Sequence, residues 1–167
     1  TEEGKLPSSL MWEIATKQFQ GALIVGSYYA MERAYVKHLR AAGIPFFRLS
    51  KPSTEYNVPQ SYVAVDDYSG GYVAGEHLIK LGCTKLFHLA GPEGSWDALE
   101  RKKGFLQACR DHGIDAEQIA IFQGDFHEPS GERCAEHLLQ FDELPHGLFA
   151  ANDMMAIGCM RVLQRSG

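Results

Sequence analysis

Short apolar runs alternate with amphipathic stretches along the chain, and residues 62–92 show the pattern most clearly. The apolar run 62–65 is followed by two aspartates, by apolar residues at helical spacing, and by a second apolar run, 86–90, that ends at Gly91-Pro92. This order is typical of a βαβ unit, whose parallel strands are buried on both faces and therefore read as continuous apolar runs. The segment predicts α/β architecture, with a helix over residues 70–81.

The same alternation predicts elements before and after this segment. Strands are expected where a short apolar run lies between glycines, prolines or polar turns, and helices where apolar residues recur every three or four positions. Connections of about 3–7 residues between them are typical of a doubly wound sheet. The remaining expected strands are 22–25, 44–49, 119–123 and 147–151, the remaining expected helices follow Ser8 or Ser9 and span 29–42, 97–112, 131–140 and 153–164, and residues 50–60 are expected to form a surface loop.

Composition narrows the class of protein. The chain has 167 residues, of which 45% are hydrophobic and 22% are charged, an ordinary balance for a water-soluble globular protein. Its formal net charge of -5 argues against a nucleic-acid surface on this segment, because phosphate binding needs clustered Lys and Arg. Any DNA contact would have to come from another segment.

The cysteines and the lengths of the apolar runs indicate the cellular compartment of the protein. Cys83, Cys109, Cys134 and Cys159 include no CxxC pair, which argues against a zinc site and favours a reducing compartment, although an even number leaves disulfides open. The first ten residues lack a signal-peptide pattern, and no apolar run approaches the roughly 20 residues needed to cross a bilayer. We therefore expect a cytoplasmic protein that does not enter the membrane.

The sequence matches none of the common catalytic motifs. The sequence has no G-x-S-x-G elbow, no P-loop and no G-x-G-x-x-G, because Gly70, Gly71 and Gly75 have the wrong spacing. No nucleophile is accompanied by a recognisable base. The sequence therefore predicts a protein that is not an enzyme and that uses neither a metal nor another cofactor.

Four longer stretches, in this order, are specific enough to indicate a family: VAVDDYSGGYVAGEHLIKLGCTKLFHLAGP, ERKKGF, IFQGDFHEPSG and LFAANDMMAIGCMRVL. Their order and spacing over residues 21–167 resemble the effector-binding core of the lac and purine repressor (LacI/GalR) family of bacterial transcription regulators. The resemblance implies the fold of type I periplasmic binding proteins, with two doubly wound parallel-sheet lobes, here incomplete at both ends. It assigns residues 1–82 to the N-terminal lobe and 83–167 to the C-terminal lobe, and implies that the DNA-binding helix-turn-helix domain is absent from this sequence.

The resemblance also changes the interpretation of residues 62–92. The helix 70–81 would close the first lobe, and the turn Gly82-Cys83-Thr84 would cross to the second. Residues 63–65 and 86–89 are then expected in different sheets. The small ligand is expected between the lobes, in a cleft with residues 66–69 on one side and 95–101 on the other.

Three residues that match the family motifs are candidate ligand contacts. Arg101 offers five donors in one plane to hydroxyls or a carboxylate, Phe126 offers an aromatic face to a sugar ring, and the amide of Asn152 both donates and accepts. Each has a simpler alternative. Arg101 would pair with Glu100 or Asp97 on the helix surface, Phe126 would pack into the core, and Asn152 would cap a helix.

Four further positions are weaker candidates. Ser95, Trp96 and Asp97 precede Arg101 in the loop where family members place effector-specific contacts, and Ser69 falls where some members place an acidic sugar contact. Trp96 is as well explained by packing, and Asp97 by capping the helix that follows. Because the sequence departs here from both the lactose and the purine patterns, sugar, nucleobase and sugar phosphate all stay open as effectors.

The sequence thus predicts the effector-sensing domain of a DNA-binding transcription regulator, with a sugar or a related small polar metabolite as its ligand. The resemblance implies a homodimer, in which Ile157, Met160 and Arg161 are candidate contacts, and DNA binding through a helix-turn-helix domain outside this chain. Two other classes fit the same pattern. One is a periplasmic sugar-binding component of a transporter, and the other is an α/β enzyme that uses the same open sheet.

Overall fold

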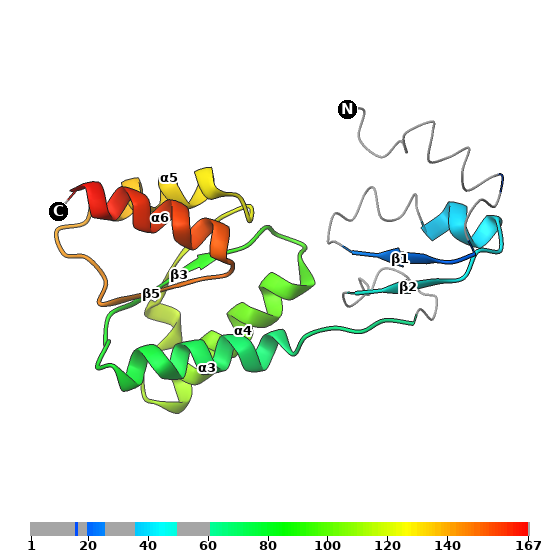
Figure 1. Cartoon of the computed structure of the whole chain (residues 1–167). Coiled ribbons are helices and arrows are strands. Elements are labelled where there is room, and N and C mark those ends of the chain that lie inside the picture. The colour runs from blue at the N-terminus through cyan, green and yellow to red at the C-terminus, as the bar shows by residue number, and fades with distance from the viewer. Residues whose placement is uncertain (1–15, 17–19, 26–35, 50–60, 167) are drawn as a thin grey trace. The chain divides into compact units, whose positions relative to one another are not determined.

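The computed structural model describes residue 16 and residues 20–25, 36–49 and 61–166, which fall into two compact units, residues 1–65 and 66–167 (Figure 1). Within these residues parallel strands alternate with helices, so the predicted α/β class is confirmed. The expected helix after Ser8 or Ser9 and the expected loop 50–60 lie outside the described residues, apart from residue 16.

The first unit contains a two-stranded parallel sheet. Strand β1 (Ala22–Ile24) pairs with β2 (Phe46–Arg48), and Ala22 lies opposite Phe46. The described end of a helix, residues 36–41, packs on the sheet through Leu39, which forms a core cluster with Ile44. Gly43 ends this helix with a φ of 66°, a left-handed conformation that glycine adopts without steric cost.

The second unit is a three-layer sandwich. Its parallel sheet has the order β4-β3-β5, with β3 (Leu86–Ala90) between β4 (Ala120–Gln123) and β5 (Gly147–Ala150). Helices α3 (Asp67–Lys80) and α4 (Trp96–Asp111) cover one face, and α5 (Glu128–Leu138) and α6 (Asp153–Ser166) cover the other (Figure 1). A short 3₁₀ helix, Ala116–Gln118, precedes β4.

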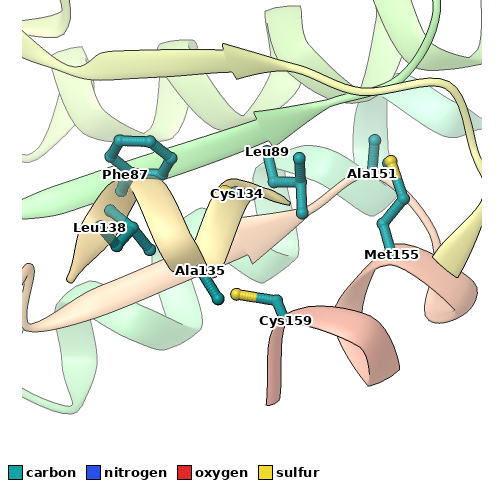
Figure 2. Close-up of a cluster of buried hydrophobic side chains, with 8 residues drawn as sticks. All are labelled: Phe87, Leu89, Cys134, Ala135, Leu138, Ala151, Met155 and Cys159. Atoms are coloured by element: carbon teal, nitrogen blue, oxygen red, sulfur yellow. The ribbon is translucent and has the colours of Figure 1, made fainter. Parts of the chain in front are cut away.

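All five residues of β3 are buried, because its alternate side chains enter two different cores. Leu86 joins a cluster with Phe105 and Cys109 beneath α4, and the ring of His88 packs there against Phe105. Phe87 and Leu89 face the opposite layer, where α5 and α6 meet. That second cluster, drawn in Figure 2, comprises Phe87, Leu89, Cys134, Ala135, Leu138, Ala151, Met155 and Cys159.

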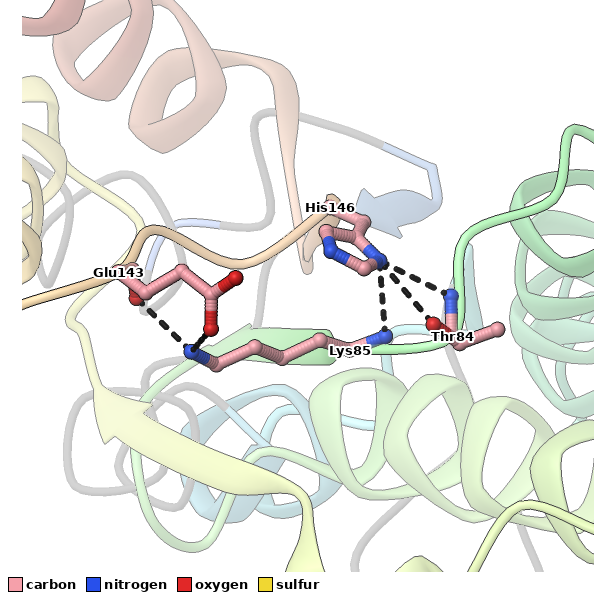
Figure 3. Close-up of polar contacts among 4 residues, drawn as sticks. All are labelled: Thr84, Lys85, Glu143 and His146. Atoms are coloured by element: carbon pink, nitrogen blue, oxygen red, sulfur yellow. Dashed lines mark hydrogen bonds and ion pairs between the residues drawn. The ribbon is translucent and has the colours of Figure 1, made fainter.

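Polar contacts fasten the amino-terminal edge of this sheet (Figure 3). The Nδ1 atom of His146, just before β5, accepts from the N–H groups of Thr84 and Lys85 at 3.4 Å and lies 3.1 Å from the Thr84 hydroxyl. The Lys85 ammonium donates to the carbonyl and the carboxylate of Glu143, at 2.9 and 3.0 Å. These groups tie the start of β3 to the start of β5, at the edge opposite to the loops that follow the strands.

Two predictions about residues 62–92 need correction. Residues 63–65 form no strand, and only Tyr62 makes an isolated parallel bridge, to Arg48 of the first unit. The expectation that residues 63–65 and 86–89 lie in two different sheets is therefore wrong for the first run, which lies in no sheet, whereas Leu86–Ala90 is the central strand of the three-stranded sheet. The boundary between the two compact units lies at Val65/Asp66, because α3 packs along α4 of the second unit, while the assignment of residues 1–82 and 83–167 to two lobes stays a prediction.

Candidate functional site

The candidate site lies at the carboxyl-terminal edge of the three-stranded sheet. Ser95 follows β3, Phe126 follows β4 and Asn152 follows β5, and each lies just before a helix or in the loop that leads into one. Because the three strands are parallel, the loops that follow them lie at the same edge. This edge is where an open α/β sheet binds its ligand.

Arg101 links three segments at this edge. Its Nε–H donates to the Asp67 carboxylate at 2.8 Å, and its Nη1 donates to the carbonyl oxygen of Ala151 at 2.6 Å. Its side chain is 31% exposed, whereas that of Asp67 is only 8% exposed. A guanidinium has five N–H groups, so three remain without a hydrogen bond to the described residues. The structure therefore fixes the plane of Arg101 while leaving donors available.

Asp67 is the partner that the sequence did not predict. Either Asp66 or Asp67 suits the role of N-cap for the helix that follows, and only Asp66 takes it. The Asp66 carboxylate accepts from the Ser69 N–H at 3.0 Å and from the Ser69 hydroxyl at 2.7 Å, and these bonds lower the pKa of Asp66. The hydroxyl of Ser69, a candidate ligand contact, is therefore already bonded within its own helix turn. In the sequence, Asp67 is marked only by its position next to Asp66, and an acid at that position suits a helix cap equally well.

The predicted cleft between residues 66–69 and 95–101 is wrong. Both segments belong to the same compact unit, and the Asp67–Arg101 ion pair joins them directly. A β-carbon on Gly104 would clash with the main chain of Tyr68, so the two helices approach backbone to backbone. The physical reason is close helix packing, which brings these segments into direct contact on the same side of any ligand site.

Asn152 and Phe126 are brought together by a hydrogen bond. The Asn152 amide nitrogen donates to the Phe126 carbonyl at 2.8 Å, and its amide oxygen accepts from the Met155 N–H at 3.0 Å. Asn152 thus caps α6, and Asp153 is the first residue of the helix. Phe126 has a φ of 70°, and its ring lies where a side chain on Gly91 would be. Phe126 is partly buried and packs on the core of the second unit.

The loop before Arg101 is organised by Ser95. Its hydroxyl accepts from the Ala98 N–H at 3.3 Å, so Ser95 is the N-cap of α4, and its side chain is buried. The helix begins at Trp96, so Asp97 lies in its first turn and is not the cap. The Lys103 ammonium lies over the Trp96 ring, 5.5 Å from its centroid. Ser95, like Asn152, therefore shapes the edge through a helix cap.

Gln123, at the end of β4, is a second residue that the sequence did not indicate. Its side-chain amide donates to the carbonyl of Gly91 across the end of β3. In the part of the chain that the structure describes, no group of three or more His, Cys, Asp or Glu side chains is placed to hold a metal ion. Among those same residues, no helix is long and apolar enough to cross a membrane.

The sequence was compared with known protein families, and one family matches. Residues 75–167 match the family described as periplasmic binding protein-like domain, which is more than half of the chain. The chain belongs to this family. Within the family it is related to LacI-type transcription regulators, as the four sequence stretches indicated.

Two relatives show the degree of similarity. The HTH-type transcriptional regulator CelR of Thermobifida fusca is 31% identical over 129 residues, which cover 77% of this chain and 38% of that protein. The HTH-type transcriptional repressor PurR of Haemophilus influenzae (strain PittEE) is 34% identical over 105 residues, or 62% of this chain and 31% of that protein. The chain thus spans about a third of the length of the curated relatives that it matches.

Solved structures of family members share the fold. A complex of the regulator CelR with cellobiose has a TM-score of 0.81 at 28% identity, covering 95% of this chain and 48% of that one. A LacI family regulator from Enterococcus faecium with bound ribose has a TM-score of 0.78 at 27% identity, covering 95% and 57%. A periplasmic solute-binding protein of an ABC transporter from Actinobacillus succinogenes, with bound D-allose, is 24% identical with a TM-score of 0.78, and shows the fold alone.

Proposed function

We propose that this chain is the effector-sensing part of a LacI-type transcription regulator and that it binds a small polar metabolite, a sugar or a related compound. Arg101 carries the proposal. Its side chain is held by Asp67 and Ala151, yet it keeps three N–H groups available at the carboxyl edge of the sheet. A fixed guanidinium with free donors suits a ligand rich in hydroxyl or carbonyl oxygens.

Phe126 and Asn152 complete the proposed contact set, with smaller roles than Arg101. The amide of Asn152 makes two hydrogen bonds within the chain but retains one further N–H and one further lone pair. Phe126 is positioned by that same amide and keeps part of its ring accessible. Ser95 and Ser69 would act by shaping the helix starts, and Trp96 and Asp97 would border the site at the first turn of α4.

The mechanism expected of such a regulator is a shift between conformations. An effector that binds one conformation more tightly increases its population, and this changes DNA binding elsewhere in the full-length protein. We propose that the full-length protein is a cytoplasmic homodimer whose helix-turn-helix domains bind DNA. The names of the relatives CelR and PurR, both HTH-type transcription regulators, support this assignment. The ligand site between two lobes stays a prediction from the family resemblance.

A transporter component is the second candidate function, because the periplasmic protein that binds D-allose shares the fold. The regulators are more similar in sequence, which favours regulation. The gene sequence upstream of this segment distinguishes the two. A helix-turn-helix supports the regulator, and a signal peptide would overturn it in favour of transport.

The proposal is tested by calorimetric titration of the full-length protein with a panel of sugars and nucleosides. We expect at least one ligand to bind, and Arg101→Ala and Arg101→Lys each to weaken its binding at least tenfold. Arg101→Lys is the sharper variant, since it keeps a positive charge beside the buried Asp67 carboxylate while removing the planar donors. Arg110→Ala, which removes an exposed arginine on the same helix, is the control. No binding across the panel would contradict the proposed function, and full binding by both Arg101 variants would remove Arg101 from the site.

A further inference from the structure

The charge of Arg101 is already balanced within the chain. Its guanidinium is 2.8 Å from the carboxylate of Asp67, a side chain that is almost completely buried. A buried carboxylate has lost much of its hydration and depends on its cation, so the pair is not free to separate when a ligand arrives. A ligand at the remaining N–H groups therefore meets an ion pair with no net charge, and not an unpaired cation.

Three further carboxylates lie on the segments that follow the strands or begin the helices at this edge of the sheet. Asp66 precedes Asp67 and is exposed, and its hydrogen bonds to Ser69 lower its pKa, so it is ionised near neutral pH. Asp153 is exposed in the first turn of α6, next to Asn152. Asp125 precedes Phe126, and although burial opposes the effect, hydrogen bonds from Ser130 and His127 lower the pKa of Asp125.

Most of the groups that could attract an anion at this edge, the helix N-termini and the cations, already have partners within the chain. Helix N-termini attract negative charge, but Asp66, Ser95 and Asn152 already accept hydrogen bonds from the first turns of α3, α4 and α6. Two cations near these loops are paired, Lys103 with Glu100 at 2.7 Å and Arg133 with Asp125 at 3.4 Å. An added phosphate or carboxylate group would therefore find Arg101, Lys103 and Arg133 already paired with carboxylates, and among the cations next to Arg101 on α4 only Lys102 has no ion pair with the described residues.

We infer that this site selects uncharged, hydroxyl-rich ligands and discriminates against their phosphorylated or carboxylated counterparts, with Asp67 as the residue that determines this selectivity. The inference rests on the proposed function, because it concerns the same ligand site. It narrows the effector class that the sequence left open, from sugars, nucleobases and sugar phosphates to neutral compounds.

The test compares matched pairs of ligands on the full-length protein by calorimetric titration. Glucose, ribose and adenosine are each measured beside their phosphate monoesters, and glucose is also measured beside glucuronate, which keeps the sugar ring. For any pair that binds, we expect the neutral member to bind at least tenfold more tightly. Asp67→Asn removes the neutralising charge but keeps a hydrogen-bonding side chain of the same size. It should lower this preference at least tenfold, a change of about 1.4 kcal/mol.

A control variant and the possible outcomes distinguish failure of the inferred charge selectivity from failure of the proposed function. Glu117→Gln removes one negative charge from an exposed side chain of the short 3₁₀ helix and should leave the preference unchanged. Tighter binding of the phosphorylated member by the unmodified protein would overturn the inference and leave the proposed function standing, even if Asp67→Asn does not fold. An unchanged preference in folded Asp67→Asn would remove Asp67 as the determinant. No binding of any compound would overturn both.

Discussion

Gly71 on α3 packs directly against the main chain of Arg101 on α4. A β-carbon built on Gly71 would lie closer than 3.0 Å to the carbonyl group of Arg101, and one built on Gly75 would meet Phe105 one turn further along. The lack of a side chain lets the helices approach backbone to backbone. Since Asp67 lies one turn before Gly71, the same close approach places its carboxylate beside the Arg101 guanidinium.

Gly71→Ala should therefore destabilise the second unit and weaken ligand binding together. The added methyl group meets main-chain atoms, which cannot rotate away, so the helices must separate. Overpacking of this kind costs about 1–3 kcal/mol. We expect a decrease of at least that size in the free energy of unfolding, measured by urea denaturation, and weaker binding of any ligand that depends on Arg101.

Gly70→Ala is the matched control for this prediction. Gly70 is the preceding residue of the same helix, it is exposed, and a β-carbon there would have no neighbour within 4 Å. Alanine favours the helix over glycine by roughly 0.5–1 kcal/mol, so this variant should be as stable as the original protein or slightly more stable. Equal effects of the two substitutions would show that the α3–α4 contact is looser than the structure indicates.

Asn152 is expected to contribute to stability through two separable hydrogen bonds. Asn152→Ala removes both the cap of α6 and the donor to the Phe126 carbonyl, whereas Asn152→Ser keeps a capping oxygen and loses only the donor. Loss of a cap costs about 0.5–2 kcal/mol, so the alanine variant should unfold at a lower urea concentration than the serine variant. If both variants have the same unfolding free energy, the cap of α6 contributes nothing measurable.

The fold of the second unit could be predicted from the sequence because its strands are short and fully buried. The run 86–90 reads as continuous apolar sequence around one histidine, and the structure makes it the central strand β3. The run 62–65 looks similar in sequence, yet Val65 is 80% exposed and only Tyr62 pairs with another strand. An apolar run alone does not tell whether a neighbouring strand is available to pair with it.

The candidate site was predicted in part, and the remainder depends on contacts between distant residues. Arg101, Phe126 and Asn152 do lie on loops and helices at one edge of the sheet, but the partners Asp67 and Ala151 are 34 and 50 residues from Arg101 in the chain. The choice between Asp66 and Asp67 as the helix cap was also not visible. Either acid suits an N-cap, and only the packing of α3 on α4 turns Asp67 toward the arginine.

The four cysteines should differ sharply in reactivity. Cys109 and Cys134 are fully buried and Cys159 is 2% exposed, whereas Cys83 is partly exposed. Burial raises the pKa of Cys109, and a hydrogen bond to Cys159 together with burial raises the pKa of Cys134, so these thiols are poor nucleophiles. With Ellman's reagent at neutral pH, one thiol should react rapidly in the native protein. Cys83→Ser should abolish this fast phase, and a fast phase that persists would contradict the burial of the others.

His88 is expected to make the second unit sensitive to mild acid. Its ring lies at the centre of β3 between Phe105 and Phe149, with ring centroids 5.4 and 5.1 Å away, and its Nδ1–H donates to the Phe149 carbonyl at 2.9 Å. Burial lowers the pKa of His88 from 6.5 to about 4, and the ammonium of Lys102 adds to this effect, although the bond to Phe149 opposes it. The folded protein therefore holds this imidazole in its neutral form.

The sign of the pH dependence follows from these two pKa values. Between pH 6.5 and about 4 the unfolded chain binds a proton at His88 that the folded chain does not, so the free energy of unfolding falls as the pH falls. The total loss is about 3 kcal/mol, at 1.36 kcal/mol for each pKa unit. Asp66 and Glu76, whose pKa values are lowered by their hydrogen bonds, titrate below most of this range, so their effect is separable.

Urea denaturation at a series of pH values between 7 and 4.5 measures this dependence. His88→Phe keeps an aromatic ring between Phe105 and Phe149 but cannot bind a proton, so its unfolding free energy should change much less over the range. The variant lacks the hydrogen bond to the Phe149 carbonyl, so its unfolding free energy at pH 7 should be lower. This loss does not depend on pH and leaves the change of unfolding free energy with pH unaffected. His77→Gln, at an exposed position of α3, should keep the slope of the unmodified protein. The same slope in His88→Phe would mean that another group causes the acid sensitivity.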